Sequence, residues 1–176
     1  GRNFSYDNSD LEALKQLKEV KVVCPMNQLG GHDGANNVIR GLKTAAAEVQ
    51  GTYPNTMEIQ KVFIEKGRFI NENDIKESRK VCVIGNRVFE MLFKSHENPI
   101  GQYIQINGVY FKVIGMSKPL VGGNDGRDQA QRIVIPFTSF QKAFNFGDRV
   151  GWFAINSQDN IPAKVAEDKV ISVLKE

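Results

Sequence analysis

The chain has 176 residues, 41% of them hydrophobic, which suffices for one domain or two small lobes around an apolar core. Its 23 lysines and arginines nearly balance 20 aspartates and glutamates, and the net charge of +3 comes without the basic stripe that binding of a nucleic acid requires. This charge balance excludes nucleic acid as a partner. No apolar run approaches the roughly 18 residues that cross a bilayer, which excludes a membrane span within these residues.

The N-terminal part predicts a helix followed by a strand. Residues 9–12 have the S-x-x-E form of a capping box, and leucines at helical spacing extend the helix to about Glu19. The apolar run 20–24 is typical of a strand, which Pro25 is expected to close. The glycine-rich run 30–34 then predicts a turn.

Residues 38–64 carry signals for both strands and helices. Residues 38–42 resemble a strand, whereas the alanine-rich run 44–49 favours a helix by propensity alone. Pro54 is expected to start a helical turn. Residues 62–64 begin a further apolar stretch, and Ile75 follows a polar turn that is rich in Asn and Glu.

A strand, a helix and a hairpin are predicted in the middle of the chain. The strand at 81–84 leads into a helix that Asn86 is expected to cap. Residues 102–115 predict a β-hairpin, because an Asn-Gly pair at 107–108 supplies the positive φ angles of a tight turn between two alternating segments. The apolar positions of the helix and the hairpin are Val88, Phe89, Leu92 and Phe93, and Ile104, Ile106, Phe111 and Val113.

The C-terminal third contains one long polar segment between predicted elements. The glycine-rich run 122–128 is expected to form a loop, too polar to pack. A strand at 132–136 and a short helix from Thr138 follow, then a strand at 152–155 and a last helix after Pro162. The phenylalanines near the short helix are expected to belong mainly to the core; they are Phe137, Phe140, Phe144 and Phe146.

The inventory of reactive side chains is poor. The two histidines, His32 and His96, are far apart in sequence, so we expect no metal site, no cofactor site and no catalytic triad. Cys24 and Cys82 both lie in apolar extended runs, where a free cysteine commonly packs as a small hydrophobic residue. We therefore predict two buried thiols and no disulfide.

Three segments in fixed order resemble the extracytoplasmic core domain of MacB-type ABC transporter permeases, part of the MacB/LolC/LolE/FtsX-like superfamily. Residues 67–75 resemble the family's G-R-x-[FI]-x-x-x-D segment, and residues 80–93 resemble its strand followed by a helix ending in L-F. Residues 98–115 resemble N-P-[IV]-G-x-x-[IL]-x-[IL]-[ND]-G-x-x-[FY]-x-V-[IV]-G. Ordered matches over about fifty residues are more specific than any single motif.

The resemblance implies an α+β fold, a two-lobed mixed α/β extracytoplasmic domain with a discontinuous first lobe. In this interpretation residues 1–58 and 150–176 form the lobe nearer the membrane, and residues 59–149 form an inserted lobe with the hairpin at 102–115. Related proteins have strands in the alanine-rich region, so we expect strands at 44–49, because sheet context overrides weak helix propensity. The domain lies between two transmembrane helices in the family, so we expect this chain to be an excised piece.

The function that the resemblance implies is mechanical and not catalytic. ATP hydrolysis by an ABC ATPase subunit or domain would move the permease, and this domain would open and close on the periplasmic side of the bacterial inner membrane during efflux or export. The implied partners are a periplasmic adaptor and a second permease copy, although the isolated domain is expected to be a monomer. The candidate partner-contact segment consists of Gly122, Gly123, Asn124, Asp125, Gly126, Arg127 and Asp128.

Two alternatives remain open from the sequence. One is the domain of a lipoprotein-releasing permease, which would cradle a lipid-modified protein in an apolar groove. The other is a soluble ligand-binding or enzymatic α/β module, which would need a pocket with convergent polar groups. The resemblance also predicts that the first and last helices lie close together, because both would be rooted in the membrane.

Overall fold

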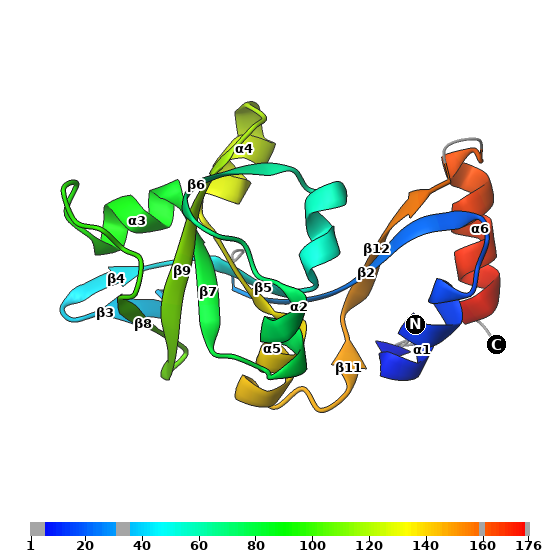
Figure 1. Ribbon diagram of the computed structural model, residues 1–176, viewed down its shortest axis with the longest axis horizontal. Coiled ribbons are helices and arrows are strands. Elements are labelled where there is room, and N and C mark those ends of the chain that lie inside the picture. Colours follow the sequence, from blue (N-terminus) through cyan, green and yellow to red (C-terminus); the bar gives the residue numbers. More distant parts are fainter. Residues whose placement is uncertain (1–5, 31–35, 159–160, 175–176) are drawn as a thin grey trace.

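The computed structural model describes residues 6–30, 36–158 and 161–174. The molecule is elongated, with the first and last helices at one end of its long axis and the β3–β4 hairpin at the other (Figure 1). The helices are α1 (Asn8–Lys15), α2 (Glu72–Lys76), α3 (Asn86–Leu92), α4 (Gly123–Ala130), α5 (Phe137–Ala143) and α6 (Ala163–Leu174), with the 3₁₀-helix η1 (Pro54–Glu58).

Ten strands form one mixed sheet in the order β12-β2-β5-β10-β7-β9-β8-β3-β4, with β6 paired to β9. The β5–β10 and β7–β9 pairs are parallel, and the other pairs of this sheet are antiparallel. This mixed α/β architecture confirms the predicted fold class. The strands are β2 (Val20–Leu29), β3 (Val38–Arg40), β4 (Lys43–Ala45), β5 (Glu48–Thr52), β6 (Val62–Gly67), β7 (Val81–Gly85), β8 (Tyr103–Ile106), β9 (Val109–Pro119), β10 (Arg132–Pro136) and β12 (Trp152–Ser157), beside a small β1 (Tyr6–Asp7) and β11 (Arg149–Val150) pair.

The predicted hairpin is confirmed. Strands β8 and β9 pair with Ile104 opposite Phe111, and the turn residues Asn107 and Gly108 have φ angles of 47° and 82°. Since side chains alternate across a strand, this register places the apolar positions on one face. All four of those positions are buried: Ile104, Ile106, Phe111 and Val113. Strands β4 and β5 likewise confirm the predicted strands around the alanine-rich run.

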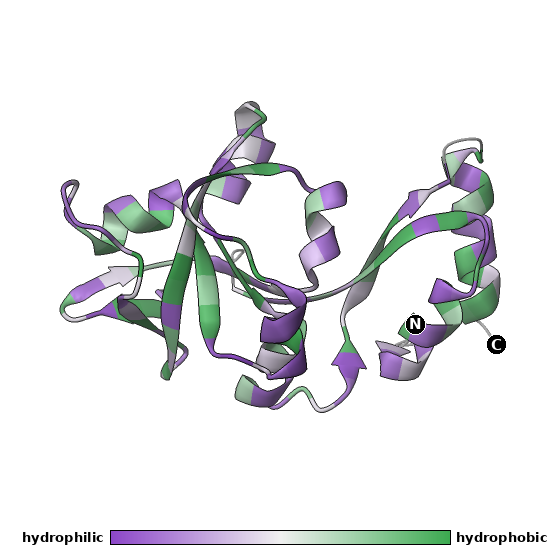
Figure 2. Cartoon of the chain, in the orientation of Figure 1, coloured by the Kyte–Doolittle hydropathy of each residue, from purple (hydrophilic) through white to green (hydrophobic). Residues whose placement is uncertain are grey.

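The main core lies on the sheet between α3 and α5, and hydrophobic residues are concentrated on central strands such as β7 (Figure 2). Phe140 is fully buried in it, and the ring centroids of Phe144 and Phe146 each lie 5.0 Å from that of Phe140. The aromatic residues are therefore core, as predicted, although Phe137 belongs to a smaller cluster with Ile75 and Val150. The division into lobes 1–58 with 150–176 and 59–149 stays a prediction.

A separate cluster joins the first and last helices. Leu11 and Leu14 of α1 are buried with Ala166 and Val170 of α6, against the β2 side of the sheet. The predicted proximity of these helices is thus confirmed for the described residues. In the part of the chain that the structure describes, every helix is too short or too polar to span a bilayer.

Three predicted boundaries at the N-terminal end were wrong, and one of them is the end of helix α1, which is Lys15 and not Glu19. Helix α1 is capped by Asp7, which accepts from the backbone of Ser9 and Asp10, so the capping box lies two residues earlier than predicted. Strand β2 also continues through Pro25. The carbonyl of Met26 accepts from Gly151 on the β12 side. The backbone N–H and C=O groups of successive residues in a strand point to opposite edges, so the Pro25 nitrogen points to the edge of β2 that faces β5. Strand β5 pairs with β2 only from Asn27 onward, so no hydrogen bond is lost at Pro25.

The polar turn predicted before Ile75 is the short helix α2. Its capping box joins the Asn71 side chain to the Asp74 amide and the Asp74 carboxylate to the Asn71 amide. Asp74 is fully buried and is paired with Arg68 at 2.8 Å and Arg79 at 3.3 Å. Burial raises the pKa of Asp74, but hydrogen bonds from Arg68 and Asn71 outweigh it and hold this pKa below its usual value.

The predicted cap of α3 was also wrong. Gly85 occupies the cap position and Asn86 is the first helical residue. A side chain at position 85 would lie 2.3 Å from the carbonyl oxygen of Ala130, so the chain needs glycine there.

Cys24 and Cys82 are buried free thiols, as predicted, and burial raises the pKa of both.

Candidate partner-contact site

The candidate segment Gly122–Asp128 is not a loop, because residues 123–130 form helix α4. Glycine disfavours a helix locally, but here it allows close packing. A Cβ atom on Gly126 would lie 2.3 Å from the carbonyl oxygen of Val121. The positive φ of Gly123, 68°, also permits the sharp turn between β9 and the helix. These two glycines thus permit the tight turn into α4, although the helix propensity of this sequence is low.

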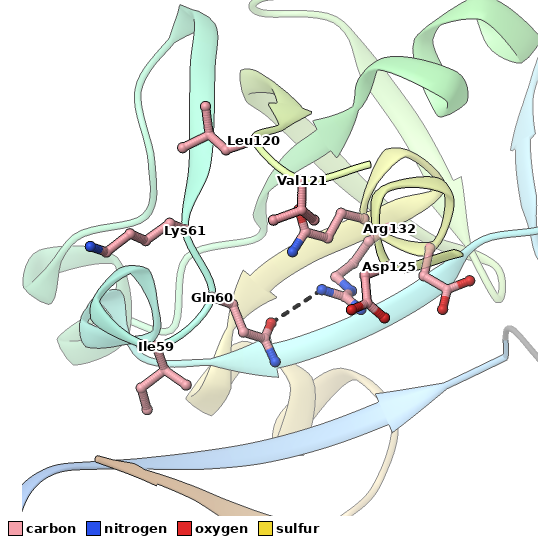
Figure 3. A pocket seen from close by; sticks show the side chains of 9 residues that line it. Ile59, Gln60, Lys61, Leu120, Val121, Asp125 and Arg132 are labelled. Carbon is pink, nitrogen blue, oxygen red and sulfur yellow. Dashed lines mark hydrogen bonds between the residues drawn. The ribbon is translucent and has the colours of Figure 1, made fainter. Parts of the chain in front are cut away.

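Helix α4 forms one wall of an open hollow of about 520 Å³ (Figure 3). The other walls come from the segment after η1, from the residues that follow β9 and from the start of β10. These segments are far apart in sequence, and the sheet brings them together. The labelled lining residues in Figure 3 are Ile59, Gln60, Lys61, Leu120, Val121, Asp125 and Arg132.

The polar side of the hollow is held by Arg132. Its Nε donates to Glu48 Oε1 at 2.8 Å. Its Nη1 donates to Gln60 Oε1 at 3.1 Å, which is the dashed bond in Figure 3. Arg132 and Glu48 are only 15% and 16% exposed, so this ion pair is partly shielded from water. The charge of Arg132 is therefore neutralised within the wall and its side chain is held in place.

The rim of the hollow carries apolar side chains and two carboxylates, together with the exposed cation of Lys61. Leu120 and Val121 are 60% and 49% exposed. Asp125 and Asp128 are also exposed, and neither carboxylate bonds to any side chain among the described residues. Exposed apolar side chains beside unpaired carboxylates suit a partner segment that carries an apolar side chain and a cation.

The structure brings only part of the predicted segment to this hollow. Asp125 and Asp128 line it, whereas Arg127 donates to the side chain of Asn124 on the same helix. The residues that sequence reasoning missed include Ile59 and Arg132. No local signal could have found Arg132, since its partner Glu48 is 84 positions away.

The histidines do not add a reactive centre to this site. His96 is exposed in the loop between α3 and β8, and His32 lies outside the described residues. Within 6–30, 36–158 and 161–174, no three His, Cys, Asp or Glu side chains are grouped as a metal site would require.

The comparison with known families gives one match over most of the chain. The model described as "MacB-like periplasmic core domain" matches residues 1–173. The macrolide export ATP-binding/permease protein MacB of Syntrophobacter fumaroxidans is 37% identical over 95 residues, which is 54% of this chain and 13% of that protein. The pyoverdine export ATP-binding/permease protein PvdT of Pseudomonas savastanoi pv. phaseolicola is 30% identical over 166 residues, or 94% of this chain and 24% of that protein.

Solved structures show the same fold. The periplasmic region of MacB from Actinobacillus actinomycetemcomitans superposes with a TM-score of 0.82 at 22% identity, covering 99% of this chain and 75% of that one. The extracellular domain of the transporter YknZ from Gram-positive bacteria gives 0.82 at 17% identity, covering 99% and 84%. The chain spans about a quarter of the length of most of the curated relatives compared.

Proposed function

Because this chain belongs to the family of MacB-like periplasmic core domains, we propose that it transmits conformational change from the membrane part of an export ABC permease to proteins outside the membrane. It is a domain of the permease and not an enzyme, since the ATPase of its relatives lies in a separate region of longer ATP-binding/permease proteins. The family assignment removes the alternative of an unrelated soluble module.

The observation that carries this proposal is the continuous strand β2. Residues 22–26 pair with β12 beside the α1–α6 cluster, whereas Asn27, Gln28 and Leu29 pair with β5 in the main sheet. A ten-residue strand spans about 33 Å. Stiff elements of this kind carry a displacement at one end to the other, so movement of α1 and α6 would reach the main sheet.

The partners follow from the same proposal. In the full-length permease α1 and α6 would be joined to transmembrane helices, two copies would form a homodimer, and an ABC ATPase subunit or domain would drive them. The α4 hollow would bind a periplasmic adaptor through a segment with apolar and basic side chains. The relatives are named for export of different compounds, macrolides and pyoverdine, which supports export without pointing to one cargo.

Loosening the junction between α1 and α6 tests the coupling. Leu14 is fully buried in their shared cluster, and Leu14→Ala should cost about 3 kcal/mol through the cavity it leaves. In the full-length permease we expect ATP hydrolysis to continue while export per ATP falls. The exposed neighbour variant Glu12→Ala serves as the control. Equal export per ATP in Leu14→Ala and wild type, with the weakened packing verified by thermal unfolding, would contradict the proposal.

A further inference from the structure

The end of the molecule farthest from α1 and α6 is formed by two turns (Figure 1). One is the β3–β4 turn, and the other is the loop between α3 and β8. We call residues 40–43 and 94–97 the distal pole. A hollow of about 550 Å³ lies between the two turns, and its lining residues are Arg40, Leu42, Lys43, Lys94, His96 and Glu97.

The tip of the distal pole is apolar and fully exposed. Leu42 has a relative exposure of 103%, the highest among the exposed large hydrophobic residues of the described chain. It sits in a two-residue turn between the paired residues Arg40 and Lys43. Gly41 has a φ of 62°, a conformation that glycine adopts without strain, and this places Leu42 outward.

The base of this turn is held by three contacts of Arg40. The Arg40 guanidinium lies 4.0 Å from the ring centroid of Phe93, which is buried at the end of α3. Arg40 also donates to the Leu92 carbonyl at 3.1 Å and forms an ion pair with Glu97 at 2.9 Å. A surface that is fixed before binding loses less conformational freedom when a partner docks.

The charge around Leu42 is positive. Glu97 is the one carboxylate of the hollow, and both its oxygens are engaged, by Arg40 and by the Lys94 amide. Hydrogen bonds from the Lys94 amide and from Arg40 hold the pKa of Glu97 below its usual value, so Glu97 stays ionised and keeps both partners. Lys43 and Lys94 are exposed and form no ion pair with the described residues.

We propose that the distal pole docks onto a partner protein that presents an apolar socket rimmed by carboxylates. Leu42 would fill the socket, and Lys43 and Lys94 would pair with the rim, since complementary charge steers and orients such contacts. A second copy of this chain is disfavoured as the occupant, because a symmetric contact would bring the same lysines together. This surface is distinct from the α4 hollow, where the carboxylates of Asp125 and Asp128 outnumber Lys61, the one unpaired cation among the described residues that line it, so the two surfaces favour partner segments of opposite charge.

A lipid surface would also attract lysines around an exposed leucine. The proposed function places the membrane at α1 and α6, at the opposite end of the long axis (Figure 1). The distal pole therefore faces away from the bilayer. The protein partner is the occupant that this geometry favours.

The test is photo-crosslinking in the full-length permease inside its own cells. p-Benzoylphenylalanine replaces Leu42, and the crosslinked peptide is identified by mass spectrometry. We expect a single partner protein, crosslinked at an apolar segment flanked by Asp or Glu. Adding Lys43→Glu and Lys94→Glu should lower the crosslinked fraction by about tenfold. The matched control Lys80→Glu with Lys112→Glu reverses the same charge at two exposed lysines elsewhere and should leave the fraction unchanged.

Each other outcome overturns the proposal. Crosslinks to phospholipid would assign the distal pole to a membrane, and crosslinks to another permease copy would assign it to self-association. A crosslink that survives reversal of Lys43 and Lys94, or the absence of any crosslinked protein, would show that charge around Leu42 does not recruit a partner. None of these results bears on whether Leu14→Ala uncouples export, so the proposed function is tested separately.

Discussion

The buried carboxylate of Asp74 should be one of the most sensitive positions for stability. It has no exposed surface, accepts two hydrogen bonds from Arg68 and one from Arg79, and accepts another from the amide of Asn71, the residue that caps α2. Hydrogen bonds to charged groups contribute about 1.5–3 kcal/mol each. The side chains of Arg68 and Arg79 are 44% and 41% exposed, so water can replace part of the hydrogen bonding that they lose when the carboxylate is removed. We expect Asp74→Asn to lower the free energy of unfolding by about 2 kcal/mol.

The assay is thermal and urea unfolding of the domain as a function of pH. A loss of about 2 kcal/mol corresponds to about 4–8 °C in a domain of this size. Because the pKa of Asp74 is lowered in the folded state, its contribution is present above the unfolded pKa of about 3.9 and is lost as pH falls through the folded value. The difference between wild type and Asp74→Asn should therefore shrink below about pH 4.

The control for this prediction is Glu77→Gln. Glu77 also pairs with Arg79 but is 57% exposed, so its loss should change stability by less than about 0.5 kcal/mol. If Glu77→Gln costs as much as Asp74→Asn, burial is not what gives Asp74 its effect. A difference for Asp74→Asn that is the same at pH 7 and pH 3 would refute the argument from its ionised form.

Two further predictions concern α4 and its hollow. Gly126→Ala should destabilise the domain by about 1–3 kcal/mol, because its Cβ would lie 2.3 Å from the Val121 carbonyl oxygen. Urea unfolding measures this change, and Gly122→Ala is the control, because a Cβ atom there would have no neighbour within 4 Å. Equal stabilities of the two variants would contradict the close packing of Gly126. Asp125→Lys combined with Asp128→Lys should leave the unfolding midpoint within about 2 °C of wild type. The same double variant should weaken binding of the adaptor by about tenfold or more, measured by calorimetry with the full-length permease. Unchanged binding would show that the hollow is not the adaptor site.

Features that depend on local pattern could be predicted from the sequence. The hairpin follows from alternation of apolar residues around Asn107-Gly108, and each of the three motifs that predicted the family spans no more than two consecutive elements. The two cysteines were predicted to be buried because their apolar neighbours indicate strands. In each case the deciding contacts are near in sequence or repeat with the period of the element.

Features that depend on long-range contact could not be predicted. Helix α4 forms against local propensity, and its end is in long-range contact with β7, where Gly85 lies against the backbone of Ala130. Strand β2 passes through Pro25 because only one edge is paired there. At the two proposed binding surfaces, the residues of the Arg132–Glu48 and Arg40–Glu97 ion pairs are 84 and 57 positions apart, so the local sequence around either residue does not indicate the pair.

The central claim is that ATP-driven movement reaches this domain as a rigid displacement, and a distance measurement between spin labels tests it most directly. A cysteine at the exposed position Tyr110 can be labelled in the full-length permease, since Cys24 and Cys82 are buried with raised pKa values and should not react. The account predicts that the label-to-label distance between the two copies shifts when ATP replaces the nucleotide-free state. Identical distance distributions in both states, in a permease that hydrolyses ATP, would contradict it.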